Sequence, residues 1–243
     1  MIRTVAIIPC YRHDNTLFNV IKEVQKNISD VIVVDDGNEK SVADNINAIA
    51  KQFANVIVLT NEINIGKGGS VAKAIHFANV KGCSHAIQID ADGQHNADDI
   101  IKLLKLCKEN PDCVISGAPI YSSDAPRSRV IGRKITNFFV HIETLSFMIK
   151  DAMIGFRAYP VNITDKIITE HNLKSRMTFD IEILVRLAWS GIKVLFFDTK
   201  VEYPKNGISN FKAIDQLRIS WMHTKLCAYS FLTLPVRIFK NAR

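Results

Sequence analysis

The sequence predicts an α/β fold in which helices flank a central, mostly parallel β-sheet. Short runs of apolar and β-branched residues recur along the first half of the chain at spacings of roughly 25 to 30 residues. Such runs are typical of strands that a parallel sheet buries on both faces. The expected strands span residues 4–9, 31–35, 56–60, 86–90 and 114–117.

Helical periodicity fills the intervals between these strands. Apolar residues at positions i, i+3, i+4 and i+7 predict helices over residues 71–78 and 100–107. Ligands of an open α/β sheet bind at the carboxyl ends of its strands. We therefore look for chemistry in the residues that directly follow each strand.

The second half of the chain has a less regular pattern. Apolar spacing predicts a long amphipathic helix over residues 131–149 and another helix over residues 178–190. A strand pair is expected at residues 193–197 and 200–203, and the last thirty residues form a predicted helical tail. There is no internal repeat and no low-complexity linker that would mark a domain boundary.

The composition excludes several classes of protein. Of 243 residues, 47% are apolar and 23% are charged, which provides a packed core and excludes a disordered or fibrous chain. No apolar run approaches the roughly 20 residues of a membrane-spanning helix, and the start of the chain does not resemble a secretory signal. We therefore expect a cytoplasmic protein. The five cysteines are scattered, without a C-x-x-C pair that would suggest a zinc or redox site.

Charge is distributed unevenly between the two halves. Residues 1–120 hold 12 basic and 14 acidic side chains, a net −2, whereas residues 121–243 hold 19 and 10, a net +9. A basic half can serve nucleic acid, anionic lipid or a phosphorylated small molecule. Charge alone leaves these alternatives open.

The fourth expected strand runs into an acidic segment, because residues 90–95 read Asp-Ala-Asp-Gly-Gln-His. In an extended chain residues i and i+2 point to the same side, so Asp90 and Asp92 can face one ligand. Two such carboxylates repel each other unless a positive charge lies between them. Mg²⁺ or Mn²⁺ fits this role, with phosphate oxygens and water completing its shell. An ordinary Asp-Gly turn is the alternative.

A second acidic strand end, Val-Asp-Asp-Gly at residues 34–37, is expected at the same edge of the sheet. We predict that one of its carboxylates is a ligand and that Asp36 contacts a nucleotide base, although an Asp that caps a helix would look similar. The segment 64–70, Asn-Ile-Gly-Lys-Gly-Gly-Ser, follows the third strand and resembles a phosphate cradle. It lacks both the Walker spacing and the dinucleotide fingerprint, so neither an ordinary ATPase nor an NAD enzyme is supported.

These segments, together with Ile-Pro-Cys-Tyr at residues 8–11, resemble in their order the family-2 glycosyltransferases of the GT-A fold. They resemble in particular the branch that includes dolichyl-phosphate and other polyprenyl-phosphate sugar transferases. That family carries P-x-Y, D-D-G, N-x-G-x-G and D-A-D-x-Q-H in the same order. Residues 151–157 look like its D-x-x-x-G-F-R segment, and residues 179–182 look like its F-x-x-E segment.

The sequence also departs from the family pattern at three places. The usual Tyr-Asn-Glu is Tyr-Arg-His at residues 11–13, and the serine that usually follows Asp-Asp-Gly is Asn38. The Gly-Ser-Arg often found after the fifth strand is Gly-Ala-Pro at residues 117–119. The first departure removes the usual acidic contact to the base.

The resemblance implies a metal-assisted, inverting transfer of a sugar from a nucleotide diphosphate sugar, with UDP favoured over GDP, to a lipid or lipid-phosphate acceptor. Asp92 and Gln94 would hold Mg²⁺ or Mn²⁺, and Asp90 would hold the ribose or share the metal. Lys67 would add charge near the diphosphate or the sugar. The residues implied in binding the nucleotide sugar are Pro9, Tyr11, Asp36, Asn64, Gly66, Lys67, Asp90 and Asp92.

The acceptor half offers two kinds of groups. Asp151, Asp180 and Glu182 are candidate general bases for a hydroxyl acceptor, whereas a phosphate acceptor needs no base. The cluster Arg127, Arg129 and Arg133 could grip such a phosphate or form a solvated face.

The resemblance also implies a division of the chain. We expect a GT-A domain at residues 1–211, with a nucleotide and metal half at 1–120 and an acceptor half at 121–211, followed by a helical tail at 212–243. The tail mixes aromatic and basic residues, which suits a peripheral helix at the inner face of the cell membrane or a helix packed on the domain.

Three other functions remain as alternatives. The acceptor could be a saccharide hydroxyl in surface-glycan assembly. A sugar-1-phosphate nucleotidyltransferase can share a similar sheet, but it usually has a Gly-rich, basic segment where this chain has Pro-Cys-Tyr at residues 9–11. Two acidic strand ends argue against a nucleic-acid-binding module. The sequence carries no signal for an oligomeric state.

Overall fold

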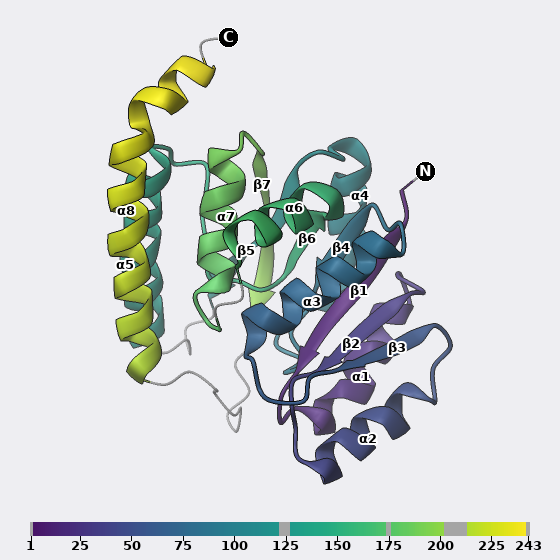
Figure 1. The fold of residues 1–243 in the computed structure, drawn as a ribbon. Helices are drawn as coiled ribbons and strands as arrows, with labels where there is room; N and C mark the ends of the chain where they lie inside the picture. Colours follow the sequence, from purple (N-terminus) through teal and green to yellow (C-terminus); the bar gives the residue numbers. More distant parts are fainter. Residues whose placement is uncertain (1, 122–126, 174–175, 202–212, 242–243) are drawn as a thin grey trace.

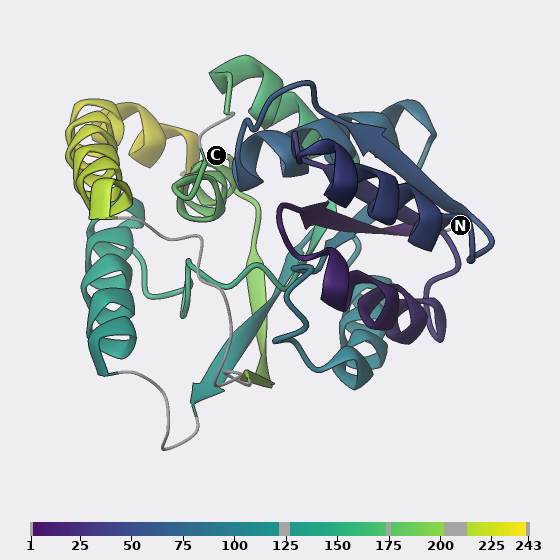
Figure 2. The same ribbon diagram turned by 90° about the horizontal axis from the view of Figure 1, so that it is seen from below.

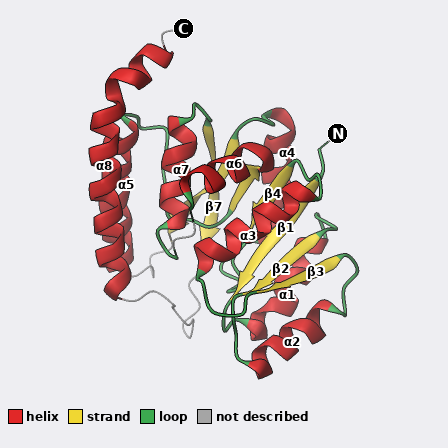
Figure 3. Ribbon diagram, viewed as in Figure 1, coloured by secondary structure: helices red, strands yellow, loops and turns green. Residues whose placement is uncertain are grey.

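The computed structural model describes residues 2–121, 127–173, 176–201 and 213–241. Within these residues the chain forms a seven-stranded sheet in the order β3-β2-β1-β4-β6-β5-β7, in which β6 alone runs antiparallel to its neighbours (Figures 1 and 3). The strands are β1 (Thr4–Cys10), β2 (Val31–Asp35), β3 (Val56–Thr60), β4 (His85–Gln88), β5 (Val114–Tyr121), β6 (Arg157–Pro160) and β7 (Val194–Val201). The predicted mostly parallel sheet and the five strands expected in the first half are confirmed.

Helices cover both faces of the sheet. They are α1 (Asp14–Gln25), α2 (Lys40–Ala50), α3 (Lys67–Val80), α4 (Ile100–Glu109), α5 (Arg127–Thr144), α6 (Val161–His171), α7 (Phe179–Trp189) and α8 (Ala213–Asn241), with a short 3₁₀ turn at Ala97–Asp99. Because successive residues of a strand point to opposite faces, Ile7 packs in the core under α3, α6 and α7, and Ile8 packs in the core under α1, α2 and α4.

Two predictions about the second half are wrong. The expected strand pair is not formed, because residues 194–201 are one strand, β7, that pairs in parallel with β5 along its whole length. Residues 202 and 203 of the expected pair lie outside the described residues. The polar residues of the edge strand β7 alternate between exposed and buried positions, since Asp198 is exposed and Thr199 is buried. The Thr199 hydroxyl donates a hydrogen bond to Asp99 Oδ2 at 2.7 Å. The helix predicted over 131–149 ends at Thr144, where Leu145 adopts a positive φ of 52°.

The expected burial of β3 also needs correction. As the edge strand beside β2 it is only partly buried, and Ile57 is exposed. A strand at the edge of a sheet has a neighbouring strand on one side only, so an apolar composition alone does not predict that the strand is fully buried.

The helical tail is confirmed as α8, which lies beside α5 at the end of the sheet opposite β3 (Figures 1 and 2). The contact centres on the buried Glu143 of α5. His223 Nδ1 lies 2.6 Å from Glu143 Oε1, and Ser230 donates to the Glu143 carbonyl at 2.7 Å. One side of the tail therefore packs on the domain. The expected domain boundary at residue 211 falls outside the described residues.

Candidate active site

The candidate site lies at the carboxyl edge of the sheet. β1 pairs in parallel with β2 on one side and with β4 on the other, with Cys10 opposite Asp35 and Ile7 opposite Gln88. The segments that follow these three strands therefore meet at one edge, as the sequence predicted for its acidic strand ends.

Lys67 is the centre of the site. Its Nζ atom lies 2.8 Å from both Oδ1 and Oδ2 of Asp90 and 2.9 Å from Oδ2 of Asp180. These groups come from the start of α3, the loop after β4 and the first turn of α7. The backbone of Gly155 packs directly against Lys67, because a Cβ atom on Gly155 would stand 2.5 Å from Lys67 Nζ. Only a glycine allows the backbone to approach so closely.

Electrostatics keep this cluster ionised. Burial by itself would lower the pKa of Lys67, but the charges of Asp180 and Asp90 outweigh burial and raise it above its ordinary value. Burial would raise the pKa of Asp90, yet the Lys67 ammonium and the contact with His95 hold it well below its usual range. The edge of the sheet thus presents a fixed cation between two fixed anions.

Behind the cluster lies a buried polar layer that sequence reasoning missed. Gln88 Nε2 donates to Asp180 Oδ1 at 3.1 Å, and the Tyr159 hydroxyl donates to Gln88 Oε1 at 3.2 Å. Arg157 is fully buried and donates through Nη1 to the Asp180 carbonyl. Its Nε and Nη2 atoms have no hydrogen-bond partner among the described residues. The sequence signals for this layer were Gln88, a polar residue within an apolar strand, and Arg157, the last residue of the segment that resembles D-x-x-x-G-F-R.

The glycine-rich loop is organised by Asp36, whose carboxylate is buried and accepts four hydrogen bonds. The donors are Asn61 Nδ2 at 3.0 Å, Asn64 Nδ2 at 2.9 Å, Ile65 N at 3.0 Å and Gly66 N at 2.9 Å. The expected phosphate cradle is thus corrected in one respect, because two of its backbone N–H groups bind a carboxylate of the chain itself. A contact of Asp36 with a base stays a prediction.

Gly37 lets the loop come this close to the end of β2. It has a φ of 64°, and a Cβ atom on it would stand 2.2 Å from the Ile63 carbonyl carbon. The neighbouring Asp35 is buried as well; its Oδ1 accepts from the backbone and side chain of Asn38 at 3.1 and 2.7 Å. Its Oδ2 has no hydrogen-bond partner among the described residues.

Arg176 lies in the segment before α7 and forms hydrogen bonds with the same glycine-rich loop. No motif in the sequence singled this residue out. Its guanidinium donates to the side chain of Asn64 and, at 2.7 Å, to the Asn64 carbonyl. Gly68 N donates to the Arg176 carbonyl at 3.0 Å, and a Cβ atom on Gly66 would stand 2.4 Å from Arg176 Cγ. More than a hundred residues separate Arg176 from Asn64, and no local pattern reports their contact.

Asp90 and Asp92 are the residues that could hold a divalent cation. Burial, and after it the nearby charge of Asp90, raises the pKa of Asp92, so the ionised Asp92 carboxylate is disfavoured here and a bound cation would stabilise it. Asp90 Oδ1, although 2.8 Å from Lys67 Nζ, has no hydrogen bond among the described residues. The residues therefore fit a metal. The described part of the chain holds no group of three or more His, Cys, Asp or Glu side chains that could bind a metal ion together. Gln94 and oxygen atoms of a bound ligand would therefore have to complete the coordination shell of the metal.

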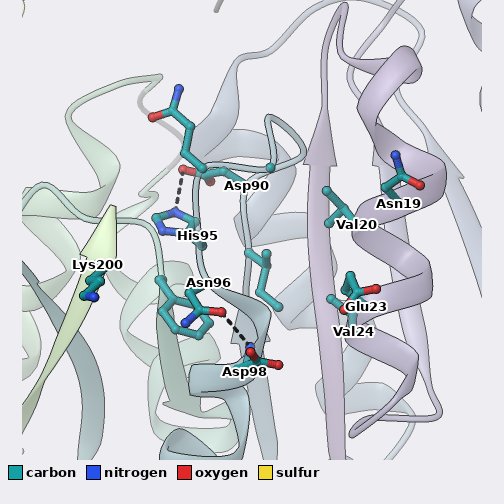
Figure 4. A pocket seen from close by; sticks show the side chains of 13 residues that line it. Asn19, Val20, Glu23, Val24, Asp90, His95, Asn96, Asp98 and Lys200 are labelled. Carbon is teal, nitrogen blue, oxygen red and sulfur yellow. Dashed lines mark hydrogen bonds and ion pairs between the residues drawn. The ribbon is translucent and has the colours of Figure 1, made fainter. Parts of the chain in front are cut away.

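His95 supports this loop from behind. Its Nε2 lies 3.6 Å from Asp90 Oδ2 (Figure 4). The centroid of its ring lies 5.3 Å from that of Phe156, and the two rings are stacked. Its backbone forms a bridge to Val201, at the end of β7. Behind the loop lies a pocket of about 340 Å³, lined by α1, the loop from Gly93 to Asp98, and Lys200 (Figure 4).

Pro9 and Tyr11 lie at the end of β1 and are partly buried. The Arg12 guanidinium stands over the Tyr11 ring at 5.1 Å, and Arg12 N donates to Asn38 Oδ1 at 2.8 Å. Both residues are therefore at the site edge, beside the Asp35 turn. Their contact with a nucleotide stays a prediction.

The predicted acceptor residues are partly engaged with one another. Arg133 Nη1 donates to both oxygens of Asp151 at 2.9 and 3.0 Å, and Asp151 Oδ1 also accepts from Met153 N and Ile154 N. Arg127 and Arg129 are exposed in the first turn of α5. Glu182 accepts from Arg186 at 2.7 and 3.0 Å on α7. Of the three candidate bases, only Asp180 contacts the Lys67 cluster directly.

A Rossmann-like sheet with carboxylates, a glycine-rich loop and a buried lysine at its carboxyl edge fits the GT-A fold of glycosyltransferases. The chain belongs to glycosyl transferase family 2, whose family model matches residues 5–168. It is therefore a glycosyltransferase, and the nucleotidyltransferase and nucleic-acid alternatives are set aside.

Known proteins show what the chain is similar to. It is 27% identical over 173 residues to UDP-N-acetylglucosamine–dolichyl-phosphate N-acetylglucosaminyltransferase of Methanococcus voltae, covering 63% of this chain and 67% of the relative. It is 26% identical over 243 residues to dolichyl-phosphate β-glucosyltransferase ALG5D of Trichomonas vaginalis, covering 88% and 72%.

Among solved structures, glucosyl-3-phosphoglycerate synthase of Mycobacterium tuberculosis, in complex with Mn²⁺, UDP-glucose and phosphoglyceric acid, matches with a TM-score of 0.64 and 12% identity, covering 96% of this chain and 79% of that one. This likeness shows the fold.

Proposed function

We propose that this glycosyltransferase inverts the anomeric centre as it moves a sugar from a nucleotide diphosphate sugar, with UDP favoured, to a lipid-phosphate acceptor. The observation that carries the proposal is the position of Lys67, held between Asp90 and Asp180 at the carboxyl edge beside the glycine-rich loop. Negative charge builds up on a departing diphosphate, and the Lys67 ammonium, together with the divalent cation proposed below to offset the two carboxylates, would stabilise it.

The site residues divide this work between them. Asp90 and Asp180 hold the Lys67 ammonium, and Gly155 leaves room for it. Asp36 and Arg176 fix the loop from which Lys67 projects. Because these contacts are in place before any substrate arrives, little reorganisation is needed when charge develops. The neighbouring Pro9 and Tyr11, with the buried Asp35 and Asp36 region, would receive the nucleoside.

A divalent cation, Mg²⁺ or Mn²⁺, would be held by Asp92 and Gln94 with Asp90, and would supply Lewis-acid charge to the diphosphate. The burial and the neighbouring Asp90 charge that raise the pKa of Asp92 support this assignment. The structural neighbour with Mn²⁺ and UDP-glucose supports the choice of metal and base.

The engagement of two of the three candidate bases supports a phosphate acceptor over a hydroxyl, whereas Glu182 accepts from Arg186 through one oxygen, Oε1. Both oxygens of Asp180 are occupied, by Lys67 and Gln88, and both oxygens of Asp151 accept from Arg133. A hydroxyl acceptor needs a base with an accessible oxygen within hydrogen-bond reach, whereas an ionised phosphate attacks without one. Arg127 and Arg129, exposed at the start of α5, would meet the acceptor phosphate.

The dolichyl-phosphate transferases among the relatives support the same acceptor class. A lipid acceptor places the reaction at a membrane, and we propose a peripheral position at its inner face. Across the described residues, no helix is both long enough and apolar enough to cross a membrane.

The test is nucleotide release from UDP- and GDP-sugars with three acceptors: a polyprenyl phosphate, the matching polyprenol and a soluble saccharide. We expect turnover with UDP-sugar and polyprenyl phosphate, and a product whose anomeric configuration, read by NMR, is opposite to that of the donor. Equal turnover with the polyprenol or the saccharide would overturn the phosphate acceptor. A retained configuration would overturn the inverting mechanism.

A further inference from the structure

The outer side of the α5–α8 pair is unusually apolar for an exposed surface. We define the outer helical face as Ile131, Ile135 and Phe138 of α5 with Leu217 and Trp221 of α8, whose exposed fractions range from 54% to 67%. Phe231 and Leu232 extend it along α8. Exposed apolar patches of this kind mark interaction surfaces.

Helical geometry collects these residues into one surface. Ile131, Ile135 and Phe138 repeat at i, i+4 and i+7, and Leu217 and Trp221 are four residues apart, so each set forms a strip along its helix. The opposite sides face the protein, with Arg133 of α5 bonded to Asp151 and Met222 and Leu226 of α8 buried in the core. Because α5 and α8 lie side by side (Figures 1 and 2) and each strip lies on the side of its helix away from the buried residues, we treat the two strips as one face.

The charges around this face all have one sign. Arg127, Arg129 and Lys134 are exposed on α5, and Arg218 and Lys225 are exposed on α8. The acidic residues of these two helices are Glu143 and Asp215, and both are buried. Among the described residues, the exposed surface of the pair is thus apolar and basic.

We infer that the outer helical face docks the protein on an anionic lipid surface. Apolar side chains would enter the headgroup boundary while Lys and Arg meet lipid phosphates. A second copy of the chain is the less suitable occupant, because pairing the face with itself would bring like charges together. The aromatic and aliphatic mixture, with Trp221 near its centre, is typical of an interfacial anchor.

The two helices that carry the outer helical face begin at the edge of the sheet where the candidate active site lies. β5 and β7 run in the same direction as β1, so α5 and α8, which follow them, begin at the carboxyl edge of the sheet (Figure 1). A membrane under the outer helical face would lie beside the edge that holds Lys67. The inference deepens the proposed lipid-phosphate acceptor, but its test does not depend on catalysis.

The experiment is co-sedimentation of the full chain with vesicles of phosphatidylcholine alone and of phosphatidylcholine with phosphatidylglycerol. We expect the protein to bind the anionic vesicles, and we expect this binding to weaken with added salt. Each basic residue at the surface should contribute a factor of roughly five to the binding constant. The combined Phe138→Gln and Trp221→Gln variant should bind at least about tenfold more weakly. Brominated lipid should quench the wild-type tryptophan fluorescence, and the Trp221→Gln variant should lose most of that quenching.

The matched control replaces two exposed apolar residues on other helices, Val80→Gln and Ile101→Gln, and should bind like the wild type. Circular dichroism and thermal unfolding check that every variant is folded. Equal binding of all variants, or no binding to anionic vesicles, overturns the inference. Concentration-dependent dimers that the Phe138 and Trp221 changes abolish, without vesicle binding, would assign the face to a second copy. Vesicle binding without turnover would leave the docking surface in place and defeat the proposed acceptor.

Discussion

The backbone of Gly155 approaches Lys67 so closely that a Cβ atom on the glycine would stand 2.5 Å from the lysine Nζ atom. The same atom would stand 2.8 Å from Asp90 Oδ2. The segment after Asp151 therefore packs closely around the ion pair of Lys67 and Asp90. Arg133 donates to Asp151, and Asp151 accepts from Ile154 N, so these contacts connect Arg133 to the residue beside Gly155.

We predict that Gly155→Ala displaces the Lys67 ammonium and lowers kcat/KM about a hundredfold, since an error near 1 Å in a catalytic group can cost that much. The measurement is nucleotide release under steady-state conditions. The control is Gly132→Ala, where a methyl group meets open space on α5. That change should leave activity intact and stabilise the helix by about 0.5–1 kcal/mol. Unchanged kinetics in Gly155→Ala would contradict the assigned role of Lys67.

Removal of the Lys67 charge should destabilise the fold as well as the reaction. Lys67→Met leaves Asp90 and Asp180 without their cation, and we expect a loss of about 3 kcal/mol in the free energy of unfolding. Adding Asp180→Asn to that variant should restore part of the loss, because one buried charge is then removed. Urea unfolding of the single and double variants gives the coupling free energy between the two residues. A coupling near zero would mean that the ion pair is not formed in solution.

Two roles of Asp36 can be told apart by one substitution. Asp36→Asn places an amide donor against the N–H group of either Ile65 or Gly66, because the two donate to different oxygens. We expect a loss of about 1–3 kcal/mol in the free energy of unfolding and faster hydrogen exchange at that amide. Asp44→Asn, at an exposed ion pair, should change stability by less than about 0.5 kcal/mol. If Asp36→Asn leaves stability intact and raises only the donor KM, Asp36 is a base contact, as its position after β2 first suggested.

Arg176 should affect catalysis more than folding. Its side chain is exposed but clasps Asn64, so Arg176→Ala should lower kcat/KM for the donor roughly tenfold through a looser loop. Stability should change by less than about 1 kcal/mol. Lys166→Ala, at another exposed site, serves as the control. Full activity of Arg176→Ala would mean that Asp36 alone is sufficient to hold the loop.

Asp92 gives a test of metal binding that needs no turnover. Without metal at neutral pH, Asp92→Asn should raise the melting temperature, because it removes a partly buried charge beside Asp90. Mn²⁺ should stabilise the wild type in proportion to its occupancy, and it should stabilise the variant much less. A thermal-shift series with Mn²⁺ and with EDTA measures both effects. Equal stabilisation of the two proteins would place the metal elsewhere.

Much of the fold was visible in the sequence because strands and helices leave local periods. The apolar runs at β1, β2, β3, β4 and β5 marked the sheet, and the polar residues after β2 and β4 marked its working edge. Errors came where the period was ambiguous. The polar residues Asp198 and Thr199 looked like a break between two strands, but they lie within one edge strand, with Asp198 exposed and Thr199 buried.

What the sequence determined by itself was the fold class, the order of the elements and the residue types that follow each strand, since these depend on neighbours along the chain. Only the tertiary structure decided that Asp180 and Asp90 share Lys67, that Asp36 fills the loop expected to bind phosphate, and that α8 packs on α5 through Glu143. These contacts join residues that are far apart in the chain. Their partners are set by the path of the loops and the packing of helices on the sheet, which no local pattern records.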